Sequence, residues 1–101
     1  MKIQDYMIPT TESTFIVEDV FTVGFGAKAR LVATGKADGE IQIGSRFNLF
    51  DGKSKIGSGT ISQIDSYHKI LQKAEPNTPI GISLTGVKKD QIKRGMKIVV
   101  G

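Results

Sequence analysis

Four groups of side chains in this sequence could bind a ligand or carry out chemistry. The first is Gly-Lys-Ser at residues 52–54, which matches the last residues of the phosphate-binding loop G-x-x-x-x-G-K-[ST]. The first glycine of that loop would have to stand at position 47, which is Phe47. The pattern fails, so we expect neither GTP hydrolysis nor a bound cofactor from this chain alone.

His68 is the second group, because it is the only histidine and follows Asp65 and Ser66. A nucleophilic triad would need the imidazole beside both a hydroxyl and an orienting acid. Neighbouring residues on a strand point to opposite faces, so this spacing does not build a triad. One histidine with scattered carboxylates also lacks the ligand spacing of a zinc or calcium site. We expect a protein that is not an enzyme, with His68 at the surface.

Cations near the C-terminus form the third group. They are Lys88, Lys89, Lys93, Arg94 and Lys97, with Asp90 as the one acid among them. The net charge is +4 overall, −3 over residues 1–20 and +4 over residues 61–101. This late excess favours an acidic partner such as RNA. Solvated lysines on a connecting turn would give the same pattern.

The fourth group surrounds Phe25, which stands between two glycines and precedes Lys28 and Arg30. An exposed ring beside cations could stack on a nucleobase while the cations contact phosphates. The alternative is a flexible glycine turn whose aromatic ring folds back over the end of the domain.

The length of 101 residues predicts a single domain, residues 1–101. Twelve glycines favour many short strands with tight turns. The absence of cysteine excludes disulfides, thiolate catalysis and sulfur-ligated metals. No apolar run approaches the ~20 residues of a membrane helix, and the N-terminus "MKIQDYMIP" lacks a signal-peptide core. We expect a soluble cytoplasmic protein with no membrane partner.

Alternating apolar residues predict strands at residues 14–23, 28–37, 46–50, 60–67, 79–86 and 96–100. The residues expected to point inward in the last two are Ile80, Ile82, Leu84, Met96, Ile98 and Val100, whereas Gly81, Ser83 and Thr85 should point outward. A bulge is expected near Ile61 and Ile64, where the alternation breaks.

Turn signals define the connections between these strands. Asp38-Gly39 and Asp51-Gly52 predict two-residue hairpins, the first of them joining residues 28–37 to 40–44. Residues 68–75 are expected to form a loop or a single helical turn, and residues 87–94 a charged turn. Six to eight short strands with almost no helix predict an all-β fold, a small closed or nearly closed antiparallel β-barrel.

Several blocks of the sequence resemble the second domain of elongation factor Tu, a translational GTPase. In order along the chain they are "FIVEDVFTV", "ATG", "DGEIQIGSRFNLF", "IDSYHKILQKA", "IGISLTGV" and "IKRGMKIV". The resemblance covers about residues 15–100 and implies a β-barrel of the translation-protein type. It also implies a non-catalytic binding module whose partners are ribosomal RNA or tRNA, or a separate GTPase domain.

The resemblance places "IDSYHK", residues 64–69, at the pocket that holds the aminoacyl end of tRNA. The family has an acid at the position of Asp65 and an arginine at the position of His68, which Lys69 follows here. It has an asparagine where this chain has Pro79, which offers no amide hydrogen and no polar side chain. The loop within residues 23–33 is also longer than in the family. The alternative to RNA binding is therefore a protein-interaction or structural module that has lost it.

Overall fold

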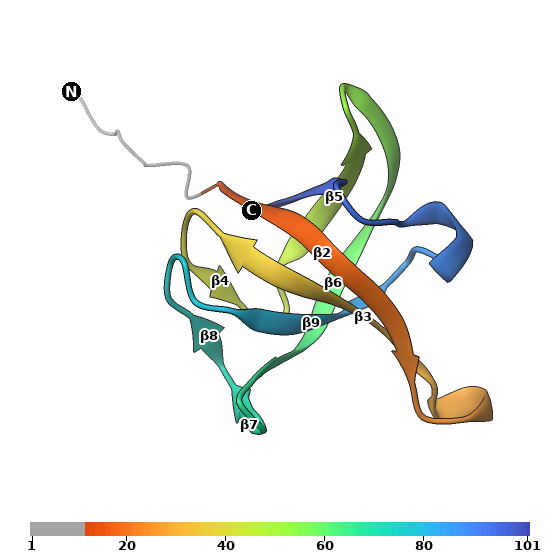
Figure 1. The fold of residues 1–101 in the computed structure, drawn as a ribbon, viewed down its shortest axis with the longest axis vertical. Helices are drawn as coiled ribbons and strands as arrows, with labels where there is room; N and C mark the ends of the chain where they lie inside the picture. The colour runs from red at the N-terminus through yellow and green to blue at the C-terminus, as the bar shows by residue number, and fades with distance from the viewer. Residues whose placement is uncertain (1–11) are drawn as a thin grey trace.

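Strands make up most of the protein, for which a computed structural model describes residues 12–101 (Figure 1). The predicted N-terminal segment "MKIQDYMIP" and the first part of the predicted domain lie outside the described residues. The elements are β2 (Ser13–Val23), η1 (Gly26–Lys28), β3 (Arg30–Ala37), β4 (Ile41–Gln42), β5 (Arg46–Asp51), β6 (Ser54–Ser66), β7 (Lys69–Leu71), β8 (Lys73–Ala74), β9 (Ile80–Thr85), η2 (Lys89–Gln91) and β10 (Lys97–Val100), where η denotes a 3₁₀ turn.

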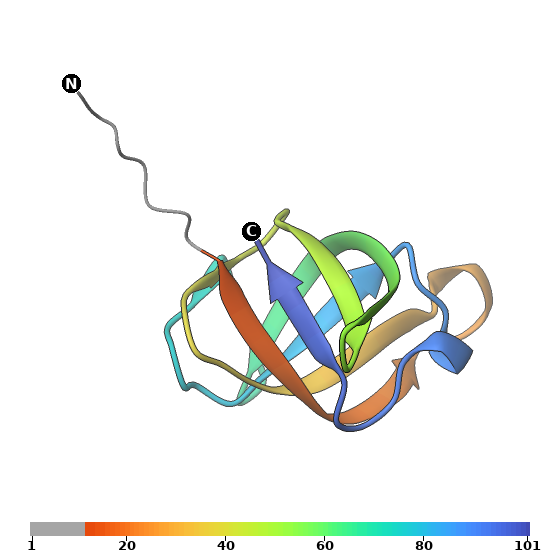
Figure 2. The ribbon, with the colours of Figure 1, turned by 90° about the horizontal axis from the view of Figure 1, so that it is seen from above.

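Six of these strands form a sheet in the order β5-β10-β2-β3-β9-β6. The last of them, β6, pairs with the first, β5, and this pairing closes the barrel. Every pairing is antiparallel, and β10 meets the beginning of β2 with Val100 opposite Ser13. Figure 2 shows these strands surrounding a common interior. The short strand β7 pairs with the end of β6, and β4 pairs with β8 as a separate ribbon. The predicted all-β closed barrel is confirmed.

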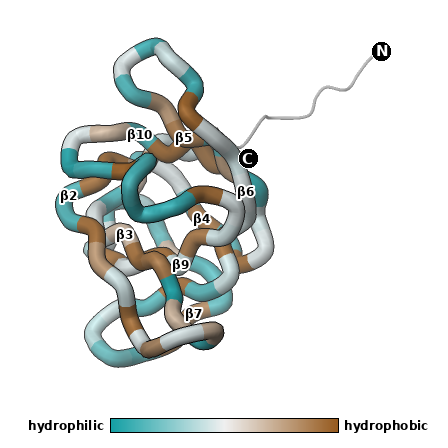
Figure 3. Tube along the Cα trace, turned by 90° about the vertical axis from the view of Figure 1, so that its right-hand side faces the viewer, coloured by the Kyte–Doolittle hydropathy of each residue, from teal (hydrophilic) through white to brown (hydrophobic). Residues whose placement is uncertain are grey.

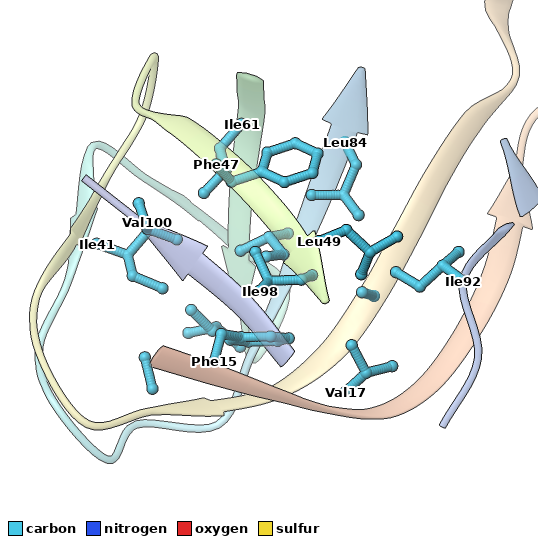
Figure 4. Packing of buried hydrophobic residues seen from close by; sticks show 14 of the residues in the cluster. Phe15, Val17, Ile41, Phe47, Leu49, Ile61, Leu84, Ile92, Ile98 and Val100 are labelled. Carbon is cyan, nitrogen blue, oxygen red and sulfur yellow. The ribbon is translucent and has the colours of Figure 1, made fainter. Parts of the chain in front are cut away.

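The interior of the barrel is filled by apolar side chains from all six strands. Phe15, Phe47 and Ile98 are fully buried and lie close to one another (Figure 4). All six residues predicted to point inward from β9 and from residues 96–100 are buried. Figure 3 shows apolar and polar positions alternating along the chain. Each buried side chain of this size contributes about 1.5–3 kcal/mol relative to exposure, so the core is the main source of stability.

The prediction of a hairpin at Asp38-Gly39 is wrong. β3 pairs with β2 and β9, while β4 pairs with β8. Neither residue has the positive φ that a type I′ turn requires. The carboxylate of Asp38 instead accepts a hydrogen bond from the backbone nitrogen of Thr14 at 2.8 Å, which ties it to β2. The backbone nitrogen of Asp38 also donates to Thr14 O at 3.0 Å, so Asp38 continues the contact with β2 instead of starting a two-residue turn.

The hairpin after β5 is confirmed, but its two loop residues are Gly52 and Lys53, with Asp51 opposite Ser54. Only Gly52 has a positive φ, +61°, as the first position of a type II′ turn requires. The register of β6 against β9 shifts between Ile61 and Gln63, so the bulge predicted near Ile61 is also confirmed.

Residues 68–75 form neither the predicted loop nor a helical turn. β6 ends at Ser66, the chain reverses at Tyr67 and His68, and β7 and β8 follow. The helix propensity of this stretch is overridden because β7 pairs with β6 and β8 pairs with β4.

Barrel closure forces β6 against the end of β9. A methyl group on Gly59 would overlap the carbonyl oxygen of Thr85, and one on Gly86 would meet the backbone of Ser58. Because the obstructing atoms belong to the backbone, they cannot move aside as a side chain would. The crossing therefore requires glycine at residue 59.

Replacing Gly59 by alanine should lower the free energy of unfolding by about 1–3 kcal/mol or more, because the added methyl group overpacks the crossing. The measurement is urea denaturation followed by circular dichroism. Gly81→Ala is the control, because its φ is not positive and the added methyl group would meet only side-chain methyl groups, Val32 Cγ1 at 3.3 Å and Thr34 Cγ2 at 3.7 Å. Equal stability of the two variants would contradict the account of the crossing.

The β4–β8 ribbon carries the one ion pair within residues 12–101, between Lys73 Nζ and Glu40 Oε2 at 3.5 Å. A hydrogen bond from Gln42 and the charge of Lys73 hold the pKa of the Glu40 carboxyl below its ordinary value. A lowered pKa in the folded state stabilises the fold above the unfolded-state pKa. This contribution is lost as the pH falls through the folded-state pKa.

Glu40→Gln should therefore lower the urea midpoint slightly at pH 7 and leave it unchanged at pH 2, where the carboxyl is protonated in both states. Urea titrations of both proteins at the two pH values measure the difference. The effect should be small because both side chains are exposed. A larger loss at pH 2 than at pH 7 would refute this assignment.

Candidate functional site

Four of the five predicted C-terminal cations lie on a turn that the core holds on both sides, and the fifth, Lys97, begins β10. We call residues 88–94 the cationic turn. Val87 and Ile92 are buried in the hydrophobic core, one before the turn and one within it. The side-chain oxygen of Gln91 accepts a hydrogen bond from the backbone nitrogen of Lys88 at 2.8 Å, which stabilises the single turn η2.

Backbone hydrogen bonds fix the far end of the cationic turn to β2. Gly95 N donates to Val17 O at 2.8 Å, and Val17 N donates to Met96 O at 3.0 Å. The φ of Gly95 is +93°, a conformation that glycine adopts without steric cost, so glycine relaxes this corner. The cationic turn is consequently held by backbone contacts that do not involve its charged side chains.

Lys88, Lys89, Lys93 and Arg94 are all exposed. Within residues 12–101, none of the four has a carboxylate within ion-pairing distance, and Asp90 is also exposed. The cationic turn thus presents four charges to solvent on a fixed backbone.

A hydrogen-bonded chain joins two other predicted site residues, Arg30 and Asp65. Arg30 Nη1 donates to Gln63 Oε1 at 3.2 Å, and Gln63 Nε2 donates to Asp65 Oδ1 at 3.0 Å. Sequence reasoning missed Gln63 because β3 and β6 are distant in sequence and β9 lies between them.

The Arg30–Gln63 bond spans the outer face of β9 and explains the burial of Ser83. Ser83, which was predicted to point outward, is opposite Val32 and Gln63 in the sheet and is nevertheless only 1% exposed. Its side-chain oxygen and the Nε of Arg30 are buried without a hydrogen-bond partner in the described structure. The Arg30 side chain is therefore engaged in contacts within the barrel, unlike the exposed cations of the cationic turn.

The β6–β7 hairpin presents His68 and Lys69, the remaining residues predicted near Asp65. Tyr67 and His68 occupy the two loop positions with φ of 49° and 68°. Positive φ at both positions is the type I′ pattern, which normally favours Asn-Gly. Tyr67 is 78% exposed and Ile70 is 69% exposed, so the hairpin displays two large apolar side chains in a strained turn.

Replacing Tyr67 and His68 together by Asn-Gly should raise the free energy of unfolding by about 1 kcal/mol, because both residues then suit a left-handed backbone. Thermal and urea unfolding measure the change. The swap Tyr67→Phe is the control and should leave stability within about 0.5 kcal/mol, since the ring is exposed. A destabilised double variant would show that the native pair makes contacts that compensate its strain.

A groove of about 230 Å³ lies beside this hairpin, and Asp65, Tyr67 and Pro79 help to line it. It corresponds to the place where the resemblance puts the end of tRNA. Glu18 also lines the groove, and no cation does. The two carboxylates make the groove unfavourable for a phosphate group.

Phe25 and Lys28 lie in the loop that carries η1, at the tip of the β2–β3 hairpin. Phe25 is 93% exposed, so the alternative of a ring folded back over the barrel is wrong. In Figures 1 and 2, the η1 loop and the cationic turn both lie on the right of the molecule, away from the C-terminus. His68 and Lys69 project from a different part of the barrel, beside β7.

Within residues 12–101, no three histidine or carboxylate side chains gather in a way that could hold a metal ion. The same residues contain no helix long and apolar enough to cross a membrane.

The fold is the all-β barrel of translation factors. A solved structure that shares it is translation elongation factor SelB from Methanococcus maripaludis in its apo form, with a TM-score of 0.73 and 19% sequence identity. The match covers 89% of this chain and 19% of that chain, so this protein spans about a fifth of the factor's length. No protein-family model matches the sequence. The predicted resemblance to an elongation factor Tu-like barrel is confirmed at the level of the fold.

Proposed function

We propose that this chain is a non-catalytic, translation-associated module that binds RNA phosphates through the cationic turn. The observation that carries the proposal is the set of four exposed cations, unpaired within residues 12–101, on a turn whose backbone is fixed by the core and by β2. Architecture alone does not require this charge. The location consistent with such a role is the cytoplasm.

The fixed backbone favours binding because the loop does not lose further conformational freedom when it meets a partner. The exposed lysine side chains each add a charge that can displace a counterion from a phosphate. Binding of this kind is independent of base sequence and weakens steeply with salt.

Ribosomal RNA or another RNA surface suits this site better than the aminoacyl end of tRNA. The groove at Asp65 and Pro79 is acidic, whereas the cationic turn is basic. Phosphates are repelled by the first and attracted by the second.

A protein partner is the second candidate, which the exposure of Tyr67 and Ile70 favours. Tyrosine is enriched at protein interfaces, and a large aliphatic side chain so exposed is a common docking residue. A separate GTPase domain is the partner that the resemblance suggests. Binding through this hairpin would be insensitive to changes in the cationic turn.

The RNA proposal is tested by changing Lys88, Lys89, Lys93 and Arg94 to glutamine. Fluorescence anisotropy with a ribosomal RNA fragment should show weaker binding at every salt concentration. If all four contact phosphates, the slope of log affinity against log salt should flatten by about 2.8–3.6, at roughly 0.7–0.9 per lost contact.

The matched control changes four exposed cations elsewhere, Lys36, Arg46, Lys53 and Lys55, which gives the same net charge. This control should retain most of the affinity. Absence of RNA binding by the wild type at low salt, or equal losses in the two variants, would refute the proposed site.

A further inference from the structure

The tip of the β2–β3 hairpin displays a phenylalanine almost entirely to solvent. Phe25 is 93% exposed, although phenylalanine is among the residues most often buried. We propose that this loop, residues 24–29, is a stacking finger that takes one unpaired nucleobase of RNA against the Phe25 ring. The inference rests on the proposed function and adds the kind of RNA, which is a single strand or a loop.

The backbone of the finger is set by glycines and by its own hydrogen bonds. Gly24 and Gly26 have φ of +91° and +58°, values that other residues rarely adopt, and Phe25 between them is extended. Lys28 N donates to Phe25 O at 3.2 Å, and Ala29 N donates to Gly26 O at 3.1 Å. The loop is therefore a closed turn that holds the ring outward.

The finger extends beyond the barrel. Residues 19–23 of β2 pair only with residues 30–34 of β3, because β10 meets β2 only at residues 13–16. Figure 1 shows this end of the hairpin projecting with η1 at its tip. Phe21 and Val23 are partly exposed on the same strand and, at a spacing of two, lie on one face. They add exposed apolar surface on the strand that leads into the finger.

Charge around the finger favours a polyanion over an apolar pocket on a protein. No acid occurs between Asp19 and Asp38 in the sequence, whereas Lys28 and Arg30 lie at this end of the hairpin. Lys28 is exposed and three residues from the ring. Proteins that hold single strands combine stacking aromatics with backbone-tracking cations in this way.

The position of the finger also fits the proposed function. The η1 loop and the cationic turn lie towards the same side in both Figure 1 and Figure 2. An RNA whose backbone crosses the cationic turn could place an unpaired base on Phe25. Stacking would then add affinity for unpaired RNA to the sequence-independent attraction of the cations.

The test compares the wild type with Phe25→Leu, which keeps an apolar side chain without an aromatic face, and Phe25→Trp, which keeps the face. The probe is a single-stranded RNA of about twelve nucleotides carrying 2-aminopurine, alone or as a duplex with its complement. Phe25→Leu should lose about 5- to 150-fold in affinity for the single strand, as stacking contributes about 1–3 kcal/mol per base. Binding to the duplex should be unchanged.

Quenching of 2-aminopurine fluorescence should accompany binding of the wild type and Phe25→Trp and be absent in Phe25→Leu. All three proteins should melt at the same temperature, because the ring is exposed. Single-strand binding by Phe25→Leu with wild-type affinity would overturn the finger and leave the proposed function standing. Self-association that only Phe25→Leu abolishes, with RNA binding unaltered, would also overturn it by assigning the finger to a second copy. Failure of the wild type to bind either RNA at low salt would remove the proposed function itself.

Discussion

The close backbone crossing between β6 and the end of β9 is the constraint on which the rest of the structure depends. β6 must pass Thr85 and Gly86 to pair with β9 on one side and β5 on the other, and only that double pairing closes the barrel. A closed barrel leaves few free edges, so its connections become the parts of the surface that can differ. The η1 loop, the cationic turn and the β6–β7 hairpin are all such connections.

The surface has two regions of opposite electrostatic character. Carboxylates line the groove at Glu18 and Asp65, whereas the cationic turn and the η1 loop carry exposed positive charge. A uniformly charged partner can engage only one of these regions favourably. Under the proposed function, the groove would repel a polyanion while the cationic turn attracts it, and the two effects together would orient it on the barrel.

Sequence patterns predicted the barrel well because strand alternation is a local property. Ile80, Ile82 and Leu84 alternate as a half-buried strand must, and they are buried. The failures occur where distant residues decide the outcome. Asp38 bonds to Thr14, and a bridge from Arg30 to Gln63 covers Ser83. Neither contact leaves a signal within a short window of sequence.

The candidate site was likewise predictable where it depends on residue type and unpredictable where it depends on contacts between distant residues. The sequence was sufficient to single out the cations and Phe25, because charge and aromatic character follow directly from residue type. The exposure of the Phe25 ring depends on the conformation of Gly24 and Gly26, for which the sequence allowed two outcomes. The rigidity of the cationic turn depends on hydrogen bonds to Val17, some eighty residues earlier in the chain.

The pairing of Ser13 with Val100 brings the two ends of the described chain together on neighbouring strands. In Figures 1 and 2 the C-terminus lies away from the η1 loop and the cationic turn. Ends that meet make the barrel suitable for circular permutation, with a short linker joining them and a new opening at the exposed Gly52–Lys53 loop. The same geometry would let the whole barrel be grafted into a loop of another protein, with its basic side still facing outward.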